Sequence, residues 1–170
     1  NWDYRYTWVR DASFSVYSLL GMGFTEEAAA LGRWLRERVG EQADKNGSGP
    51  LKIMYRVDGT SDLTEDILEH WEGYRGSAPV RIGNGAADQL QLDISGEAMD
   101  SLHVADRHGL APAHEGWLRV CDLLDWVTEN WDRPEEGIWE TRGGRQDFTY
   151  GRLMCWVALD RGIRLATEHG

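Results

Sequence analysis

The segment of residues 137–142 places the carboxyl group of Glu140 between the indole ring of Trp139 and the cation of Arg142. A carboxyl group beside an indole loses part of its water, which disfavours the charged form and raises its pKa. A carboxylic acid that keeps its proton near neutral pH can protonate a leaving group. Arg142 acts in the opposite direction, because a nearby cation favours the ionised form. Glu140 is therefore a candidate general acid, and spacing alone leaves open that it is a solvated glutamate on a polar turn.

A second group of polar residues, Arg10 and Asp11, follows Trp8 at the start of a predicted helix. Backbone N–H groups at a helix N-terminus stabilise the negative charge of an aspartate, and the arginine supplies planar donors. A sugar hydroxyl needs both an acceptor and a donor, so this pair is suited to binding adjacent hydroxyls of one sugar. Composition alone favours a simpler interpretation, in which Asp11 caps the helix and Arg10 lies on the surface.

A third candidate is the segment of residues 80–89, in which two glycines separate the polar residues Arg81, Asn84 and Gln89. Glycines let a ligand approach the backbone closely. The segment lacks the Lys-Ser/Thr ending of a phosphate-binding loop. A ligand-binding loop and a turn leading into the next helix are equally good interpretations of this pattern.

The charge balance restricts the partners. The 170 residues include 29 acidic and 18 basic side chains, for a net charge of -11. Nucleic acids and anionic membranes both require clustered Lys and Arg, so the composition excludes both and favours a neutral polar substrate. Nine tryptophans are unusual, and their flat apolar faces are suited to stacking on sugar rings as well as to core packing.

The chain offers no pattern for a metal ion, a cofactor or a membrane anchor. No cluster of Cys and His has metal-ligand spacing, and no apolar run is long enough to cross a bilayer. The two cysteines are too few for a disulfide framework, so we expect a reducing compartment, and hence a cytoplasmic location.

Hydrophobic periodicity predicts an all-α fold with about five helices and little strand. The first helix passes through Ala12 and Leu20 and ends at two glycines, and a short extended segment is expected at residues 51–57. A long irregular stretch, residues 62–84, is rich in Trp, Tyr and Arg and is expected to be functional. The other helices are expected at residues 25–39, 87–108, 113–131 and 149–167. Within the last of these, Gly151 costs on the order of 1 kcal/mol relative to Ala.

Five segments, in this order along the whole chain, resemble glycoside hydrolase family 15, which holds glucoamylase-like and trehalase-like enzymes. Any single segment is weakly specific, but the ordered set is strongly so. They are residues 4–12, 70–77, 80–84, 88–93, and 137–142 together with 148–150.

The resemblance implies an (α/α)6 barrel with its site at one end of the toroid. It also implies inverting hydrolysis of α-glucosidic bonds in an oligosaccharide or disaccharide with a terminal α-glucose. Glu140 matches the family's general acid. Arg10 and Asp11 match the pair that holds the terminal glucose, with Trp8 beside it.

Three further site residues are expected from the same resemblance. Arg81 and Asn84 are expected to line the next part of the pocket, and Trp139 to bind substrate next to the acid. The family's general base is a second glutamate in a segment that this chain does not reach.

A complete barrel has twelve helices, so about five helices imply an incomplete one. Residues 1–170 are therefore expected to be the N-terminal part of the catalytic domain, inactive alone and with apolar helix faces exposed. The main alternative is a non-catalytic carbohydrate-binding helical module, which keeps the tryptophan planes and does not need Glu140. A helical scaffold for protein partners is a third possibility.

Overall fold

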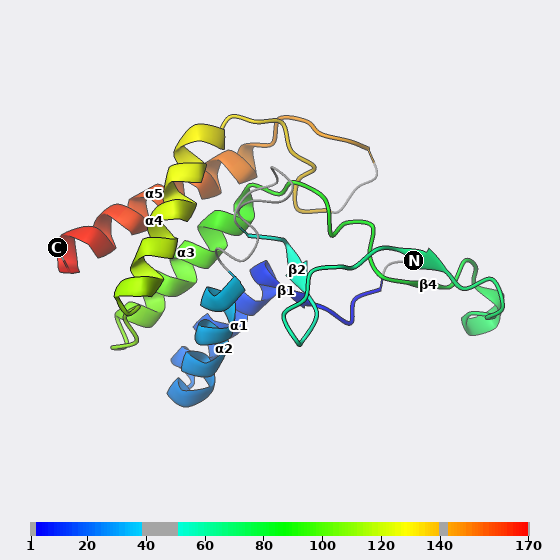
Figure 1. The fold of residues 1–170 in the computed structure, drawn as a ribbon, viewed down its shortest axis with the longest axis horizontal. Helices are drawn as coiled ribbons and strands as arrows, with labels where there is room; N and C mark the ends of the chain where they lie inside the picture. The colour runs from blue at the N-terminus through cyan, green and yellow to red at the C-terminus, as the bar shows by residue number, and fades with distance from the viewer. Residues whose placement is uncertain (1–2, 39–50, 140–142, 170) are drawn as a thin grey trace.

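The computed structural model describes residues 3–38, 51–139 and 143–169. Within these ranges the chain is mainly helical, which confirms the predicted class (Figure 1). The five α-helices are α1 (Val9–Gly21), α2 (Thr25–Arg38), α3 (Asp93–Asp106), α4 (His114–Asn130) and α5 (Thr149–His169). No helix among the described residues is long and apolar enough to cross a lipid bilayer.

Two short antiparallel pairs of strands lie outside the helices. The strand β1 (Thr7–Trp8) leads into α1 and pairs with β2 (Met54–Tyr55), within the predicted extended segment. The strands β3 (Asp66–Ile67) and β4 (Arg81–Ile82) pair with each other. Together with the 3-10 turn η1 (Tyr74–Gly76), β3 and β4 form an arm that extends away from the helices (Figure 1).

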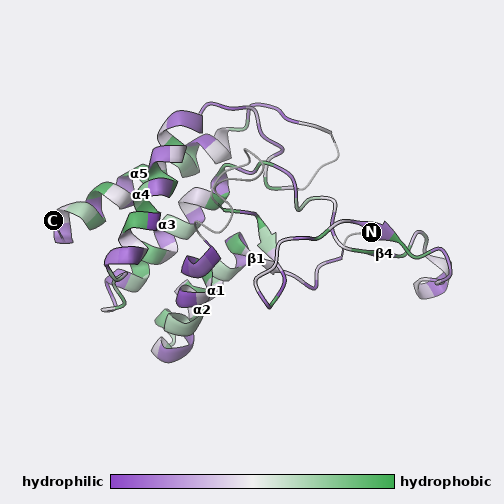
Figure 2. Ribbon diagram, viewed as in Figure 1, coloured by the Kyte–Doolittle hydropathy of each residue, from purple (hydrophilic) through white to green (hydrophobic). Residues whose placement is uncertain are grey.

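Helix α3 occupies the centre of the helical part, because it packs against α1 on one side and α5 on the other. Helix α2 packs on α1, and α4 packs on α5. Near their N-terminal ends α3 and α5 are joined by Glu97 and Tyr150, and at their C-terminal ends by Asp106 and His169, so the two helices run in the same direction. Apolar and polar stretches alternate along each helix, as expected for helices that each bury one face (Figure 2).

Gly96 permits the close approach of α3 and α5. A Cβ atom at this position would lie 2.3 Å from the carbonyl oxygen of Met154 and 2.8 Å from its carbonyl carbon. A side chain here would collide with backbone, which cannot rotate away. The glycine therefore fixes how tightly the two central helices pack.

The predicted start of the third helix is wrong. The periodicity placed it near Ala87, but α3 begins at Asp93, and residues 85–91 form a turn followed by an irregular segment. The N–H groups of Leu90 and Leu92 are bound by carboxyl groups from a loop more than forty residues later. These tertiary hydrogen bonds replace the helical ones that the apolar spacing predicted.

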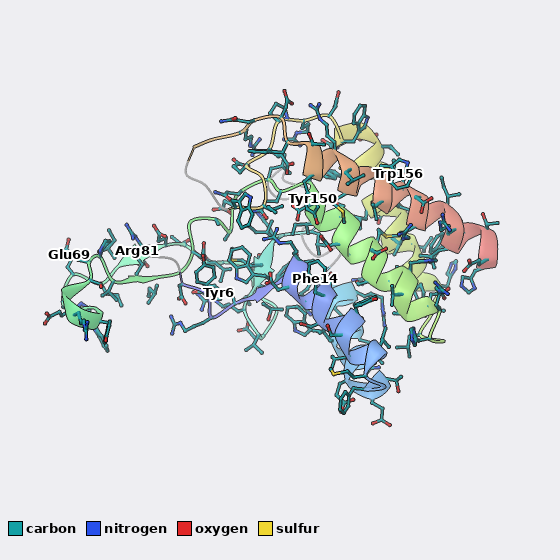
Figure 3. The ribbon with its side chains drawn as sticks, turned by 180° about the vertical axis from the view of Figure 1, so that it is seen from behind. Tyr6, Phe14, Glu69, Arg81, Tyr150 and Trp156 are labelled. Atoms are coloured by element: carbon teal, nitrogen blue, oxygen red, sulfur yellow. The ribbon has the colours of Figure 1, made fainter. Side chains whose placement is uncertain are left out.

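Large apolar side chains are exposed on the outer faces of α1 and α5. Phe14 and Tyr17 on α1 are more than half exposed, as are Trp156 and Ile163 on α5. Figure 3 shows Phe14 and Trp156 on the outside of their helices. Exposed apolar side chains, which the sequence analysis expected, are therefore present on these two helices, and the incomplete barrel itself stays a prediction.

Candidate active site

Arg10 connects three segments at the N-terminal ends of the central helices. Its Nη1 donates hydrogen bonds to Gln91 Oε1 and Asp93 Oδ2, both at 3.0 Å. Its Nη2 donates to the carbonyl oxygen of Ile138 at 3.4 Å. The guanidinium group therefore holds the start of α1 against the segment before α3 and against the loop before Glu140.

The ion pair between Arg10 and Asp93 is almost completely buried. The Asp93 side chain is 0% exposed and the Arg10 side chain 14% exposed. Burial raises the pKa of Asp93, and the charge of Arg10 and its hydrogen bond oppose that rise. Asp93 Oδ1 has no hydrogen-bond partner within the described part of the chain. Asp93 is also the first residue of α3, where the helix dipole stabilises a carboxylate.

A second buried carboxyl group, that of Glu97, lies one turn further along α3. Its Oε1 accepts a hydrogen bond of 2.6 Å from the hydroxyl group of Tyr150, in the first turn of α5. Burial raises the pKa of Glu97 and the hydrogen bond from Tyr150 opposes that rise. Burial and the contact with Glu97 also raise the pKa of Tyr150, so its hydroxyl group stays a donor.

The loop that carries Glu140 is closed at its base by a pair of backbone hydrogen bonds. The N–H group of Glu135 donates to the carbonyl oxygen of Gln146 at 2.9 Å, and the N–H group of Gln146 donates back at 2.7 Å. Next to this pair, the Glu136 N–H donates to the carbonyl oxygen of Leu90 at 2.9 Å. Glu136 Oε2 accepts from the Leu90 N–H at 2.7 Å, and Arg145 Nε donates to its Oε1 at 3.1 Å.

The predicted residues at the helix ends fall into two groups. The structure brings Arg10 to the segment that precedes Glu140, and Trp139 in that segment is 79% exposed. Asp11 is exposed in the first turn of α1. The predicted acid Glu140 and its neighbour Arg142 lie outside the described residues, so their predicted roles stay predictions.

Three other predicted residues have contacts elsewhere. Trp8 is 8% exposed and packs against the ring of Tyr4, with 5.8 Å between ring centroids. Arg81 lies on the arm, away from the helix ends, and forms an ion pair of 3.3 Å with Glu65 (Figure 3). Asn84 is 1% exposed and donates from Nδ2 to the carbonyl oxygen of Asp3 at 2.9 Å. The structure does not test whether these three residues contact a sugar.

The sequence-based interpretation missed the buried acidic residues of the site. Asp93 was part of the segment that carried the family resemblance, but it was given no role. Glu135 and Glu136 directly precede the segment of Glu140, and Tyr150 ends the resembling segment 148–150 but was likewise given no role. Position within or next to these segments was the available signal, because the partners of these residues are distant in the sequence.

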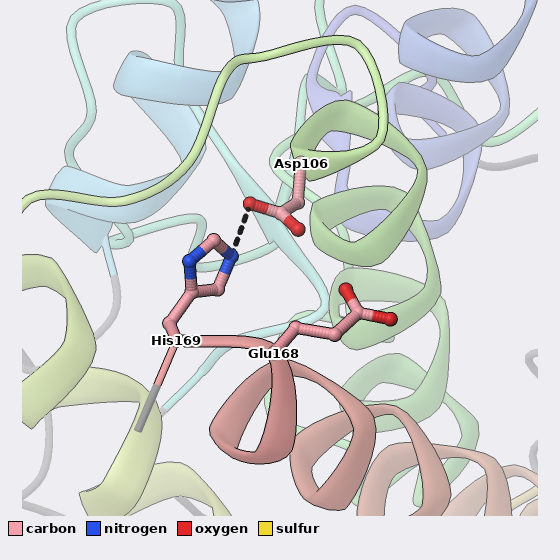
Figure 4. A group of neighbouring side chains, drawn as sticks. All are labelled: Asp106, Glu168 and His169. Carbon is pink, nitrogen blue, oxygen red and sulfur yellow. Dashed lines mark hydrogen bonds and ion pairs between the residues drawn. The ribbon is translucent and has the colours of Figure 1, made fainter.

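A separate group of polar residues lies at the other ends of α3 and α5 (Figure 4). His169 Nε2 and Asp106 Oδ1 are 2.8 Å apart, and Glu168 lies beside them. Potential ligand atoms of the three residues are within 4.8 Å of one another, but Glu168 and His169 are exposed. The fourteen residues of α3 separate this group from Asp93 by about 20 Å. The hydrogen bond between His169 and Asp106 accounts for the contact, and we assign no metal to this group.

Comparison with known sequences identifies the family of the chain. The sequence model of glycosyl hydrolases family 15 matches residues 1–170, and the chain belongs to this family.

Curated relatives of the chain are named trehalases. The chain is 42% identical to the trehalase of Mycolicibacterium smegmatis over 172 residues, which cover 100% of this chain and 25% of the relative. It is 40% identical to the trehalase of Mycobacterium tuberculosis, again over 100% of this chain and 25% of the relative. It is 37% identical to trehalase 1 of Sulfolobus acidocaldarius, over 95% of this chain and 28% of the relative. The chain thus spans about a quarter of the length of these relatives. No solved structure gives a significant match.

Proposed function

We propose that this chain supplies the general acid of an active site that hydrolyses a terminal α-glucosidic bond with inversion. One observation carries the proposal most directly, namely the hydrogen bond from Arg10 to the carbonyl oxygen of Ile138. Ile138 precedes Glu140 by two residues, so this bond holds the segment of the proposed acid beside the predicted sugar-binding pair. Family membership gives independent support for the reaction class.

Each side chain of the site has a role in this proposal. Glu140 donates a proton to the departing glycosidic oxygen. Asp11, exposed at the positive end of α1, accepts a hydrogen bond from a hydroxyl group of the terminal glucose. Arg10 lies in the wall beside it, and the exposed indole of Trp139 offers an apolar face to the sugar ring. Trp8, the residue before α1, lies beside this pair in the proposal, as the family resemblance suggests.

We assign the next part of the pocket to the loop that carries Arg81 and Asn84, as the family resemblance suggests, and the buried Asn84 side chain holds this loop to the backbone of Asp3. The substrate is an oligosaccharide or disaccharide with a terminal α-glucose. Since the similar curated proteins are named trehalases, trehalose is the first substrate to test.

The proposal includes the architecture of the complete domain. We assign residues 1–170 to the N-terminal part of an (α/α)6 catalytic domain. The packing supports this, because α3 lies between α1 and α5, while α2 packs mainly on α1 and α4 packs on α5. Alternation of this kind is what two concentric rings of helices require. Inversion needs a second carboxyl group about 6.5–9.5 Å from the acid, to activate water. We assign that base to a glutamate outside residues 1–170.

The alternative is a carbohydrate-binding helical module without catalysis. It would use the exposed tryptophan planes and would leave Glu140 without a role.

A cytoplasmic location stays a prediction. The two cysteines, Cys121 and Cys155, are both free, and burial raises the pKa of Cys155 to about 12.

The test uses the full-length protein that contains this segment and compares Glu140→Gln with Glu129→Gln. Glu129 is exposed on α4 and serves as the matched control. We expect the first variant to lose trehalose hydrolysis by at least a hundredfold while it still binds glucose, and the second to be unchanged. Proton NMR during the first turnovers should show α- and β-glucose in equal amounts, because inversion changes only one of the two glucose units. Normal turnover by Glu140→Gln would remove the acid role, and α-glucose alone would exclude inversion.

A further inference from the structure

The side chain of Glu135 is buried at the base of the loop that carries Glu140. The residue is 1% exposed, and its Oε2 accepts a hydrogen bond of 2.6 Å from the N–H group of Leu92. Its other carboxyl oxygen, Oε1, has no hydrogen-bond partner among the described residues. The backbone of Glu135 pairs with Gln146, so one residue closes the loop and also attaches it to the segment before α3.

The segment that receives this loop is the same one that holds Arg10. Within residues 90–93, the N–H groups of Leu90 and Leu92 are bound by Glu136 and Glu135. The side chains of Gln91 and Asp93 accept hydrogen bonds from Arg10. Residues 90–93 therefore alternate between contacts to the loop that carries Glu140 (residues 135–146, called the acid loop below) and contacts to Arg10. Any shift of the loop relative to this segment changes the distance between the acid and the sugar-binding pair.

Helix α5 closes the space around the Glu135 carboxyl group. A Cβ atom at Gly151 would lie 1.8 Å from Oε1 of Glu135 and 2.6 Å from its carboxyl carbon. Glycine at this position therefore makes room for the carboxyl group. This explains why a residue that lowers helix stability occupies position 151 in α5. Burial raises the pKa of Glu135 to about 7, with the Leu92 hydrogen bond opposing that rise and the charges of Asp93 and Glu136 adding to it.

We propose that Glu135 is a positioning residue for the hydrolysis, which acts by holding the Glu140 loop against residues 90–93. The inference rests on the proposed function of Glu140 as the acid. Glu135 is enclosed by α5 and by Leu92, so it acts through the loop rather than on the substrate. Misplacement of a catalytic group by about 1 Å can cost on the order of a hundredfold in rate.

The experiment compares two substrates in the full-length protein. Trehalose has a sugar leaving group that needs a proton, whereas α-glucosyl fluoride releases fluoride with much less help from an acid. We expect Glu135→Ala to lower kcat for trehalose about 10- to 100-fold and kcat for the fluoride by less than threefold. Glu135→Gln keeps an acceptor for the Leu92 N–H and should restore most of the trehalose rate. A role in folding alone would lower both rates equally, and that result would overturn the proposal.

A second variant tests the same contact without removing Glu135. Gly151→Ala should displace the carboxyl group and give the same selective loss for trehalose. In the Glu135→Ala background the extra methyl group meets no carboxyl, so Gly151→Ala should then have no further effect. Independent, multiplicative losses would contradict the proposed contact. Glu129→Ala, which changes an exposed glutamate on α4, is the control.

The Glu140→Gln variant separates this proposal from the function on which it rests. If Glu140→Gln loses trehalose hydrolysis but Glu135→Ala keeps it, only the positioning role is wrong. If Glu140→Gln hydrolyses trehalose normally, the assignment of the acid is wrong and the positioning role is lost with it.

Discussion

Replacing Gly96 by alanine tests the packing of the two central helices. The new methyl group would lie 2.3 Å from the carbonyl oxygen of Met154, where ordinary contacts begin at 3.4 Å. The helices must therefore separate by about 1 Å, and overpacking of a core costs about 1–3 kcal/mol. We take the upper end, because backbone cannot rotate away. Alanine returns about 1 kcal/mol of helix propensity, so the net loss of stability is about 2 kcal/mol.

Hydrogen exchange of the full-length protein, read by mass spectrometry, measures this local loss. A decrease of about 2 kcal/mol makes the amides of α3 and α5 exchange about 30-fold faster. Gly32→Ala is the matched control, since a Cβ atom there meets only the Arg36 side chain, at 3.4 Å. That variant should slow exchange in α2 by up to about fivefold, through helix propensity alone. Unchanged or slower exchange in α3 of Gly96→Ala would show that the helices are not in contact at this glycine.

Two further predictions concern the charged groups of the site. Arg10→Lys should lower kcat for trehalose at least tenfold, because one ammonium group cannot reach Gln91, Asp93 and Ile138 together. Steady-state kinetics of the full-length protein measures this effect. A wild-type rate would contradict the connecting role of Arg10. The second prediction concerns Glu135, whose pKa rises from 4.5 to about 7 in the folded state, so that the folded protein binds this proton more tightly than the unfolded chain. Its contribution to stability is complete below about pH 4.5 and is lost as the pH rises through about 7, by an amount on the order of 3 kcal/mol. Urea unfolding at pH 5 and pH 8 should show a smaller difference for Glu135→Gln than for the wild type, and equal differences would place the Glu135 pKa near its ordinary value.

Hydrophobic spacing was sufficient to predict most helices, because each helix buries one continuous face. It failed at the start of α3 for a physical reason. Leu90 is buried, and its position fits the same apolar pattern as Ile94 and Leu102 in the helix that follows. Whether such a segment becomes helical depends on which acceptors bind its N–H groups. Here the partners are Glu135 and Glu136, which lie 43 and 46 residues away, and no local pattern contains that information.

The candidate site was predictable in part for a related reason. Arg10 was selected for its donors, and the structure places it beside the loop of the proposed acid. Asn84 was selected for its polar side chain, which instead binds the backbone of Asp3 and Ala86. Residue type shows which hydrogen bonds a side chain can make. The partner it finds is determined by the fold, and for a buried side chain that partner is usually part of the protein.

Arg10 and Asp11 illustrate how one short motif can divide its tasks. Successive residues on a helix point about 100° apart, so two neighbours cannot face the same surroundings. Arg10 points inward, where Asp93 and Gln91 accept its hydrogen bonds, and Asp11 remains exposed in the first turn of α1. In the proposed site, Asp11 is then the member of the pair that is open to a sugar hydroxyl. The arginine contributes chiefly by holding α1, residues 90–93 and the acid loop in one arrangement. Substitution of Asp11 should therefore change sugar binding first, whereas substitution of Arg10 should change the geometry of the whole site.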